Sequence, residues 1–432
     1  MTDVSLTPFE APFEATVVPP GSKSLTNRAL VLAALAEGES TLSNVLIADD
    51  TEVMLDGLER LGFKLKLDRE KGRVKVKGEG GRIPKRNADL FCGNSGTTIR
   101  FLAALCTLGG GTARLDGNER MRERPIGELV DLLTALGATA HYEKARGYPP
   151  LLVEGTGLAG GRASYGAALS SQYLSAALIA SPYAETDVTI DLAPDQTSWP
   201  YVEMTVQLMR LFGVNVLVAL NPDRTPKQLR VLRGVYAATD YAVEPDASSA
   251  TYFLAAAAIS PGAKVTVPGL GRASLQGDVG FADVLAEMGA EVTVADDSVT
   301  VRGAELRGID VDMSGMPDAA MTLVVAAAFA DGPTTIRGLH TLPVKETDRL
   351  AALKTELGKL GATVEATGDT LRIDPPVEVT GAAIDTYDDH RMAMAFAVAG
   401  TRVPGVTIRG AECVSKTYPR FFEDLAALSG KR

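Results

Sequence analysis

FADVLAEMGAEVTV, residues 281–294, changes its hydrophobic period at a single glycine. Phe281, Val284, Leu285 and Met288 recur at the spacing of one face of an α-helix. Gly289 follows where a helix commonly stops in the left-handed conformation. The alternating residues EVTV, a turn and SVTVRG come next. The stretch predicts an amphipathic helix followed by a β-hairpin.

The same pattern occurs five times along the chain. Its closing glycines are Gly62, Gly137, Gly213, Gly289 and Gly361, at intervals of 75, 76, 76 and 72 residues. Repetition at a fixed period indicates one supersecondary unit used several times.

A second kind of segment, rich in small residues, interleaves with the first, as in SATYFLAAAAISPG (249–262). Six such segments occur, and their equivalent positions are Arg28, Arg100, Gln172, Ala250, Ala320 and Arg391. They lack a polar face, so we expect buried helices. Six copies of about 72 residues account for the chain. Each copy should supply a buried helix, a strand, an outer helix and two further strands.

These copies predict an α/β protein of two similar domains, each with three repeated units of inner small-residue helices and outer β-sheets. One core rarely serves so many residues, so we expect the boundary after the third copy, near residues 235–245. Gly155, Gly157 and Gly160 match the GxGxxG pattern of dinucleotide-binding folds, but GRASYG follows them instead of an amphipathic helix. We expect a turn at a hairpin end there.

The composition is that of a globular protein, with 46% hydrophobic and 22% charged residues in a chain of 432. The net charge of −11 argues against bulk binding to nucleic acid or a membrane surface. The N-terminal MTDVSLTPFEAPFEA has acids where a signal peptide has a basic start, and no apolar run reaches roughly 18 residues. We expect a soluble cytoplasmic protein with no nucleic-acid or membrane partner.

Cysteine and histidine are scarce. Cys92, Cys106 and Cys413 are odd in number and widely spaced, which excludes a disulfide framework. None of the three histidines pairs with a cysteine at ligand spacing, so a structural zinc site is not expected. We expect no metal and no other cofactor.

Polar residues precede each small-residue helix, in PGSKSLTNR, CGNSGTTIR, ALSSQYL, EPDASSAT, MPDAAMT and TYDDHRMAM. Capping by Ser, Asp and Asn explains most of them, including Asp246. It does not explain Lys23, Arg28, Arg100 and Arg391, because a cation at a helix start is unfavourable by about 0.3–1 kcal/mol. Helix starts bind phosphate and carboxylate readily, so these cations indicate an anionic ligand.

Further cations lie outside the helix starts, at Arg120, Arg122, Arg124, Lys345, Arg349 and Lys416. Each one alone is more often a solvated surface charge. Together, in an acidic chain, they would form a local positive field. The residues therefore predict an enzyme or binder of a small polyanion, with its site in a cleft between the two three-copy domains.

Eight motifs follow one another from about Pro20 to Asp424: PGSKSLTNRALVLAALA, GNSGTTIRFLAAL, DGNERMRERPIGELVDLL, SSQYLSAAL, PDAAM, VKETDRL, DDHRMAMAFA and SKTYPRFFEDL. In this order they resemble the 5-enolpyruvylshikimate-3-phosphate synthase family. That family has two domains of three copies each, with the N-terminal strand in the second. The resemblance implies domains of residues 21–239 and of residues 1–20 plus 240–432, with the active site in the cleft between them. We expect a monomer.

The resemblance implies transfer of the enolpyruvyl group of phosphoenolpyruvate to the 5-hydroxyl of shikimate 3-phosphate. Phosphate leaves after a tetrahedral intermediate, in a step of the shikimate pathway toward chorismate and aromatic amino acids. A C–O bond breaks, so no Mg²⁺-bridged phosphoryl transfer is needed. The chemistry does need an acid and a base, and cations for two phosphates and two carboxylates.

Carried over residue by residue, the resemblance implies two sets of ligands. The shikimate 3-phosphate set is Lys23, Ser24, Arg28, Ser170, Ser171, Gln172, Ser198, Asp318 and Lys345. The phosphoenolpyruvate set is Lys23, Asn94, Gly96, Arg124, Gln172, Arg349, Arg391 and Lys416. Asp318 would take the hydroxyl proton. Glu346 is the candidate for proton transfer at the methylene, with Lys23 as its rival and His390 as a lesser contributor.

Several of these residues have a purely structural alternative. Asp318 stands in the same PDA setting as Asp246 and could be only a helix cap. Glu346 and Asp348 could cap a helix starting near Thr347, and His390 could be a packed histidine. Four positions depart from residues frequent in the family: Ser95, Phe101, Thr341 and Pro343. Ser95 and Phe101 bear on sensitivity to glyphosate, which the retained Gly96 and Thr97 favour.

Three rival functions are disfavoured by the residues present. A sister enolpyruvyl transferase acting on UDP-N-acetylglucosamine shares the fold but typically has a cysteine in the loop that here reads GNERMRERP. A non-catalytic anion-binding module would have lost Lys23, Asp318 and Glu346. A purely structural repeat protein would not need cations at its helix starts.

Overall fold

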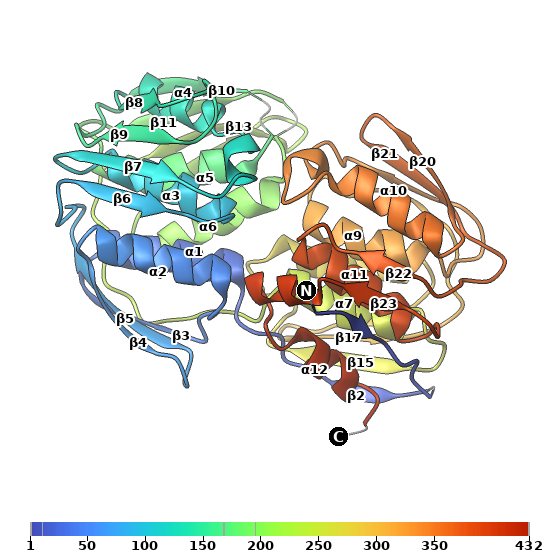
Figure 1. The fold of residues 1–432 in the computed structure, drawn as a ribbon. Coiled ribbons are helices and arrows are strands. Elements are labelled where there is room, and N and C mark those ends of the chain that lie inside the picture. Colours follow the sequence, from blue (N-terminus) through green and yellow to red (C-terminus); the bar gives the residue numbers. More distant parts are fainter. Residues whose placement is uncertain (1, 11, 167–168, 195, 431–432) are drawn as a thin grey trace. The chain divides into compact units, whose positions relative to one another are not determined.

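The computed structural model describes residues 2–10, 12–166, 169–194 and 196–430 (Figure 1). The chain divides into two compact units. One consists of Gly21–Val243, here called the N-terminal unit. The other consists of Glu244–Arg432 together with Met1–Pro20, here called the C-terminal unit.

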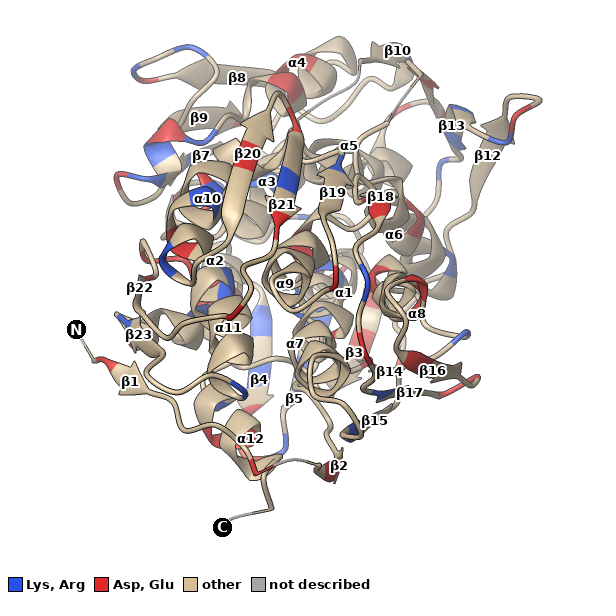
Figure 2. Ribbon diagram, turned by 90° about the vertical axis from the view of Figure 1, so that its right-hand side faces the viewer, with Lys and Arg blue, Asp and Glu red and all other residues tan. Residues whose placement is uncertain are grey.

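Three inner helices form the core of each unit. In the N-terminal unit they are α1 (Lys23–Leu35), α3 (Gly96–Cys106) and α5 (Ser171–Ala180), and in the C-terminal unit α7 (Ala247–Ala258), α9 (Pro317–Ala327) and α11 (His390–Gly400). Nearly all of their residues are buried, which confirms the prediction from their small, apolar side chains. Figure 2 shows α7 and α9 almost without charge, whereas the outer helix α10 (Arg349–Lys359) carries both signs. Among the described residues, no helix has the length and hydrophobicity to cross a membrane.

Five outer helices each lead through a glycine into a β-hairpin, as predicted. They are α2 (Asp49–Arg60) with β4 (Lys64–Asp68) and β5 (Arg73–Glu79); α4 (Gly127–Ala135) with β8 (Thr139–Tyr142) and β9 (Leu151–Glu154); α6 (Trp199–Leu211) with β12 (Val216–Leu220) and β13 (Pro226–Val231); α8 (Phe281–Glu287) with β16 (Glu291–Val294) and β17 (Ser298–Arg302); and α10 with β20 (Thr363–Thr367) and β21 (Thr370–Asp374). The glycine after each helix has a positive φ, between 86° at Gly213 and 111° at Gly289. A residue with a Cβ would be strained there, so the glycine ends the helix.

Each hairpin belongs to a four-stranded sheet. The orders are β14-β3-β5-β4, β6-β7-β9-β8, β10-β11-β13-β12, β2-β15-β17-β16 and β18-β19-β21-β20. The remaining strands are β2 (Glu14–Thr16), β3 (Glu37–Ser43), β6 (Ala88–Phe91), β7 (Thr112–Asp116), β10 (Gly161–Tyr165), β11 (Val188–Leu192), β14 (Tyr241–Ala242), β15 (Lys264–Pro268), β18 (Asp310–Asp312) and β19 (Thr334–Arg337). The first two strands in each order are parallel, and the other pairs are antiparallel.

Two of these strands come from the far ends of their units' sequences. β2 lies parallel to β15, with Glu14 opposite Lys264, and Figure 1 shows it beside that yellow strand. β14 lies parallel to β3, with Tyr241 opposite Leu42. Each therefore supplies the edge strand that precedes an inner helix in the other copies.

The sixth copy departs from the sequence prediction, because no hairpin follows its last helix within the described residues. After α11 come β23 (Thr407–Arg409), a 3-10 segment (Ala411–Lys416) and α12 (Phe421–Ala427). The sheet here has three strands, with β1 (Val4–Ser5) antiparallel to β23 and β22 (Ala383–Asp385) parallel to it.

The GxGxxG match lies in the loop between β9 and β10. Gly157 and Gly160 have positive φ values of 86° and 83°, and a strand follows instead of a helix. The predicted turn at a hairpin end is confirmed. The dinucleotide-binding interpretation is excluded because it requires a helix start at this point.

Candidate active site

The inner helices of the N-terminal unit meet within their first two turns. Arg28 of α1 donates from Nη2 to Ser175 Oγ of α5 at 3.3 Å, and its Cζ lies 5.3 Å from the ring centroid of Phe101 of α3. Arg100 of α3 donates to Gln172 of α5. The three helix starts therefore lie together, although Arg28 and Arg100 sit in the second turn rather than the first. The helix-start argument applies directly only to Lys23 and Arg391.

Arg28 is a buried cation whose hydrogen bonds within the described residues all end on neutral oxygens. It donates to Thr205 Oγ1 at 2.7 Å, Ser24 O at 3.0 Å and Tyr201 O at 3.1 Å. Burial lowers its pKa to about 10, so it still carries its charge at neutral pH. A buried charge without a counter-ion is costly, and an anionic ligand would offset that cost.

Lys23 is the first residue of α1 and has a carboxylate partner. Its Nζ lies 3.4 Å from Asp50 Oδ2, at the start of α2, and both side chains are largely buried. Ser22 caps the helix by accepting from Leu25 N at 3.4 Å. Capping and charge are therefore separate functions of neighbouring residues in this motif.

Arg124 is held against the start of α3. Its Nη1 donates to the backbone oxygen of Asn94 at 2.9 Å and to Asn94 Oδ1 at 3.1 Å. A Cβ at Gly96 would lie 2.7 Å from Arg124 Nη2 and 2.8 Å from Arg100 Nη1. Only glycine lets both guanidinium groups approach the helix start this closely.

The two neighbouring arginines of Arg124 bind carboxylates of their own segment. Arg122 Nη2 binds Asp116 Oδ2 at 2.7 Å, and Arg120 Nη1 binds Glu123 Oε2 at 2.9 Å. Of the three arginines in GNERMRERP, Arg124 is the buried one. The other two have ion-pair partners nearby in sequence.

The start of α5 presents hydroxyl groups. Ser170 caps the helix by accepting from Gln172 N at 3.3 Å, and Ser171 is the first helical residue. Ser170 and Ser171 line a small hollow together with Thr197. Ser198, which follows, has a left-handed φ of 50° immediately before α6. These donors could bind a phosphate group at a helix start.

In the C-terminal unit, one buried guanidinium binds three carboxylates. Arg349 donates from Nε to Asp389 Oδ2 at 2.7 Å, from Nη1 to Asp318 Oδ1 at 3.1 Å and from Nη2 to Glu346 Oε2 at 2.9 Å. Burial alone would lower the pKa of Arg349, but the three carboxylates raise it above the ordinary value. Arg349 therefore organises both candidate acid–base residues.

Asp318 is not a helix cap. It is the second residue of α9, and its Oδ2 accepts from Arg391 Nη2 at 2.9 Å, while Lys345 Nζ lies 3.9 Å from Oδ1. Asp246, in the same PDA setting, does cap α7 by accepting from Ser249 N at 2.7 Å. The two aspartates therefore differ in function although their local sequences agree.

Glu346 is likewise distinct from the helix cap beside it. Asp348 caps α10 by accepting from Ala351 N at 3.1 Å. Glu346 binds Arg349 and has Lys416 Nζ 3.8 Å from its Oε1, with only 7% of its side chain exposed. The capping alternative holds for Asp348 and not for Glu346.

His390, the first residue of α11, is buried, and neither ring nitrogen has a hydrogen-bond partner among the described residues. Burial, and then the charge of Arg391, lower the pKa of His390 well below its ordinary value. The imidazole is therefore neutral at physiological pH.

Three of the four departures from the family pattern are buried, and Pro343 is half-buried. Ser95 caps α3 by accepting from Thr98 N at 3.4 Å, and Phe101 stacks on Arg28. Thr341 is 1% exposed, and its hydroxyl has no hydrogen-bond partner in the described part of the chain. Pro343 lies in the 3-10 turn Leu342–Val344.

Sequence reasoning missed two members of these clusters, Asp50 and Asp389. Asp389 is fully buried, binds Arg349 twice and caps α11 through Arg391 N at 2.9 Å. The signal that could have found both is that a buried cation needs a carboxylate nearby. Their partners lie 27 and 40 residues away, so spacing alone does not reveal them.

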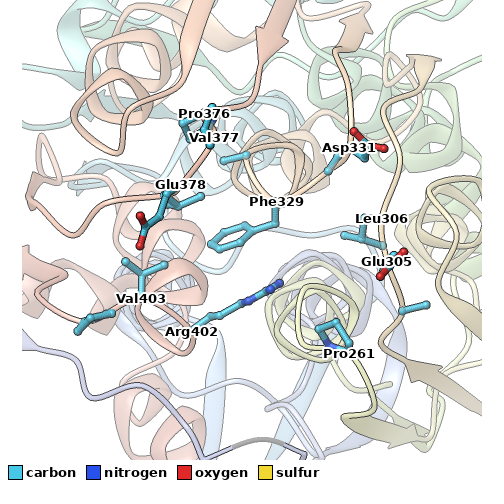
Figure 3. A pocket seen from close by; sticks show the side chains of 15 residues that line it. Pro261, Glu305, Leu306, Phe329, Asp331, Pro376, Val377, Glu378, Arg402 and Val403 are labelled. Atoms are coloured by element: carbon cyan, nitrogen blue, oxygen red, sulfur yellow. The ribbon is translucent and has the colours of Figure 1, made fainter.

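A hollow of about 610 Å³ lies in the C-terminal unit, and none of the predicted residues lines it. Figure 3 shows the side chains around it. It is lined by residues that follow the inner helices, among them Pro261, Phe329 and Arg402. The candidate site is at the starts of these helices and the hollow at their ends. The two are therefore distinct.

The comparisons with known proteins agree with one another. The family model described as EPSP synthase (3-phosphoshikimate 1-carboxyvinyltransferase) matches residues 9–425. A 3-phosphoshikimate 1-carboxyvinyltransferase of Shewanella denitrificans is 48% identical over 411 residues, covering 95% of each chain. One from Sulfurovum sp. is 47% identical and covers 99% of this chain and 100% of its own.

Solved structures share the fold. An EPSP synthase from Acinetobacter baumannii superposes with a TM-score of 0.81 at 26% identity, covering 99% of this chain and 98% of its own. The enolpyruvyl transferase NikO from Streptomyces tendae, at 20% identity, has a TM-score of 0.77 over 99% of this chain and 96% of its own. The α/β architecture of repeated units is therefore that of the enolpyruvyl transferases. The match over nearly the whole chain shows that it belongs to the EPSP synthase family.

Proposed function

We propose that this protein transfers the enolpyruvyl group of phosphoenolpyruvate to the 5-hydroxyl of shikimate 3-phosphate and releases phosphate. The observation that carries the proposal is that Asp318 and Glu346 both bind the buried guanidinium of Arg349. Two carboxylates fixed on one cation supply the acid–base pair that this reaction requires.

The reaction needs three proton transfers: one to the methylene carbon, one from the 5-hydroxyl and one from the methyl group of the intermediate. Protonation of the methylene carbon makes C2 of phosphoenolpyruvate cationic, and the 5-hydroxyl oxygen bonds to C2 as it loses its proton. The tetrahedral intermediate then expels phosphate by C–O cleavage and loses a methyl proton. We assign the hydroxyl proton to Asp318 and the methylene proton to Glu346, with Lys23 as the alternative.

His390 contributes in another way. A neutral imidazole beside Arg391 and Glu346 lacks the second ring proton that an imidazolium ion would donate as a general acid. It can accept a proton or a hydrogen bond during turnover. We therefore assign it a lesser contribution than Glu346.

Shikimate 3-phosphate is assigned chiefly to the N-terminal unit. Ser170 and Ser171 would bind its phosphate at the start of α5. Arg28 would neutralise an anionic group, because its own hydrogen bonds end on neutral oxygens. The other proposed ligands are Lys23, Ser24, Gln172, Ser198, Asp318 and Lys345.

Phosphoenolpyruvate is assigned to cations of both units, including Lys23, which would contact both substrates. Arg124 and Lys23 lie in the N-terminal unit, and Arg349, Arg391 and Lys416 in the C-terminal unit. Asn94, Gly96 and Gln172 complete the set. We propose that the two units act together on one pair of substrates, in a cleft between residues 21–239 and the rest of the chain.

The test is phosphate release from phosphoenolpyruvate, with shikimate 3-phosphate and UDP-N-acetylglucosamine as separate acceptors. Release only with shikimate 3-phosphate supports the proposal. Release only with the sugar nucleotide would assign the protein to the sister transferases. Ligand binding without release would indicate a non-catalytic module.

Variants of Glu346 and Lys23 assign the proton transfer at the methylene. Glu346→Gln keeps the size of the side chain and should reduce kcat by about 10²–10⁴-fold, as expected for loss of a general acid or base. If Lys23→Met abolishes proton exchange at the methylene while Glu346→Gln retains it, the proton comes from Lys23 instead.

We also propose that glyphosate inhibits the enzyme in competition with phosphoenolpyruvate, because Gly96 and Thr97 are retained. An inhibition curve at several phosphoenolpyruvate concentrations tests this, and full activity at high inhibitor would contradict it. We propose a cytoplasmic monomer. The three buried free cysteines fit a reducing compartment, and sedimentation equilibrium measures the oligomeric state.

A further inference from the structure

Two successive residues before helix α11 have an uncommon backbone conformation. Tyr387 and Asp388 have φ values of 54° and 56°, in the left-handed region that residues with a Cβ avoid. Among the described non-glycine residues, they are the only adjacent pair of this kind. Such a conformation persists only where the surroundings fix it, and it concentrates at functional sites.

The carboxylate of Glu356, on α10, fixes this turn from one side. It is fully buried, and its Oε1 accepts from Tyr387 Oη at 2.6 Å while its Oε2 accepts from Asp385 N at 3.0 Å. Lys359 Nζ lies 2.6 Å from Glu356 Oε2 and 2.7 Å from Asp385 Oδ2. Burial and the hydrogen bond to Glu356 raise the pKa of Tyr387 to about 12, so the hydroxyl remains a donor.

Helix α10 holds the same segment at its other end through Arg349. Arg349 binds both oxygens of Asp389, at 2.7 and 3.1 Å. Glu356 follows Arg349 by seven residues, about two helical turns, so both side chains leave the same face of α10. Residues 385–389 are therefore attached to α10 at both ends.

We propose that Glu356 is a positioning residue for phosphoenolpyruvate binding. By holding the Tyr387–Asp388 turn, it fixes the start of α11 and with it the guanidinium of Arg391. The inference rests on the proposed function for the identity of the ligand. The turn and its attachment to α10 are features of the free protein.

A matched pair of variants separates positioning from general stability. Glu356→Ala removes both hydrogen bonds to the turn. Leu357→Ala removes a buried apolar side chain from the same helix and none of the turn's hydrogen bonds. Glu356→Ala should raise KM for phosphoenolpyruvate about tenfold and leave KM for shikimate 3-phosphate within about twofold. Leu357→Ala should lower Tm and leave both KM values within about twofold.

A second substitution tests the strained turn directly. Glycine adopts the left-handed conformation without steric cost, so Tyr387→Gly in the Glu356→Ala background should recover most of the lost affinity. If the Glu356 side chain were needed only for packing, Tyr387→Gly should restore no affinity, because glycine adds no contact. If Glu356→Ala folds poorly, Tyr387→Phe removes only the hydroxyl and should raise KM for phosphoenolpyruvate about twofold to fivefold.

Hydrogen exchange of residues 385–391 without substrates gives a measurement that does not depend on turnover. Exchange should be faster in Glu356→Ala and unchanged in Leu357→Ala. Unchanged exchange in Glu356→Ala, or an equal rise in KM in both variants, would overturn the inference. Absence of turnover in the wild-type protein would instead refute the proposed function. The exchange measurement would still test whether Glu356 holds the turn, because it needs no turnover.

Discussion

Asp318 Oδ2 lies 2.9 Å from Nη2 of Arg391, which is 73 residues later in the chain. The two residues begin neighbouring inner helices, and Asp318 Oδ1 faces Arg349 as well. An anionic ligand bound to these guanidinium groups would take over contacts that Asp318 makes in the free protein. Ligand binding would thereby leave this carboxylate available as a base for the substrate hydroxyl.

Asp318→Asn should lower kcat by about 10²–10⁴-fold, because the amide keeps the size of the side chain but cannot accept the hydroxyl proton. Steady-state phosphate release measures this. Asp348→Asn is the matched control, because Asp348 caps a helix and Asn caps about equally well. A loss below about tenfold in Asp318→Asn would contradict the assignment as a base.

Gly96→Ala should weaken phosphoenolpyruvate binding selectively. The added Cβ would lie 2.7 Å from Arg124 Nη2, so the guanidinium must move. KM for phosphoenolpyruvate should rise roughly tenfold, from loss of one well-placed charged hydrogen bond, with KM for shikimate 3-phosphate nearly unchanged. Gly110→Ala, where a Cβ meets nothing within 4 Å, is the control. Equal KM values in Gly96→Ala and wild type would show that Arg124 does not contact this substrate.

Phe101→Leu should weaken shikimate 3-phosphate binding, because the aromatic face supports the buried charge of Arg28 at 5.3 Å. Such a contact is worth about 0.5–2 kcal/mol, so KM should rise about twofold to thirtyfold. Phe212→Leu alters another fully buried ring of the same unit and should leave KM unchanged. Equal effects of the two variants would indicate lost packing rather than a lost cation–π contact.

Local patterns were sufficient to predict most of the fold. The hydrophobic period and the closing glycine act within a few residues, so they recur in five copies and predict the same helix and hairpin in each. The sixth copy differs from the prediction because, among the described residues, β1 from the opposite end of the chain pairs antiparallel with β23, where a hairpin strand lies in the other copies. The local sequence of the sixth copy does not predict pairing with a strand so distant in the chain.

The candidate site was less predictable for the same physical reason. Asp246 and Asp318 share one local sequence, and only partners distant in the chain make one a cap and the other an ion-pair acceptor. The backbone of Tyr387 and Asp388 runs against local preference and is held by tertiary contacts with Glu356. Strained turns of this kind arise from the surroundings rather than from the residues themselves.

His390 should make stability depend on pH. Its folded-state pKa is well below the ordinary value of 6.5, mainly because of burial, so the unfolded chain binds the proton more readily. The contribution is complete above about pH 6.5 and is lost as pH falls toward the folded pKa, by at most about 1.4 kcal/mol per pH unit. Tm should therefore fall less between pH 7 and 5.5 in His390→Gln than in wild type. His141→Gln, at an exposed site, should behave like wild type.

The three cysteines should be unreactive in the folded protein. Burial raises the pKa of Cys106 and Cys413 to about 12, and it raises that of Cys92 as well. Because the thiolate is the nucleophile, iodoacetamide at pH 7.5 should modify none of them and leave activity intact, whereas all three should react in guanidinium chloride. Mass spectrometry of the labelled protein measures the outcome. Rapid inactivation with one modified cysteine would instead indicate a reactive thiol at the site.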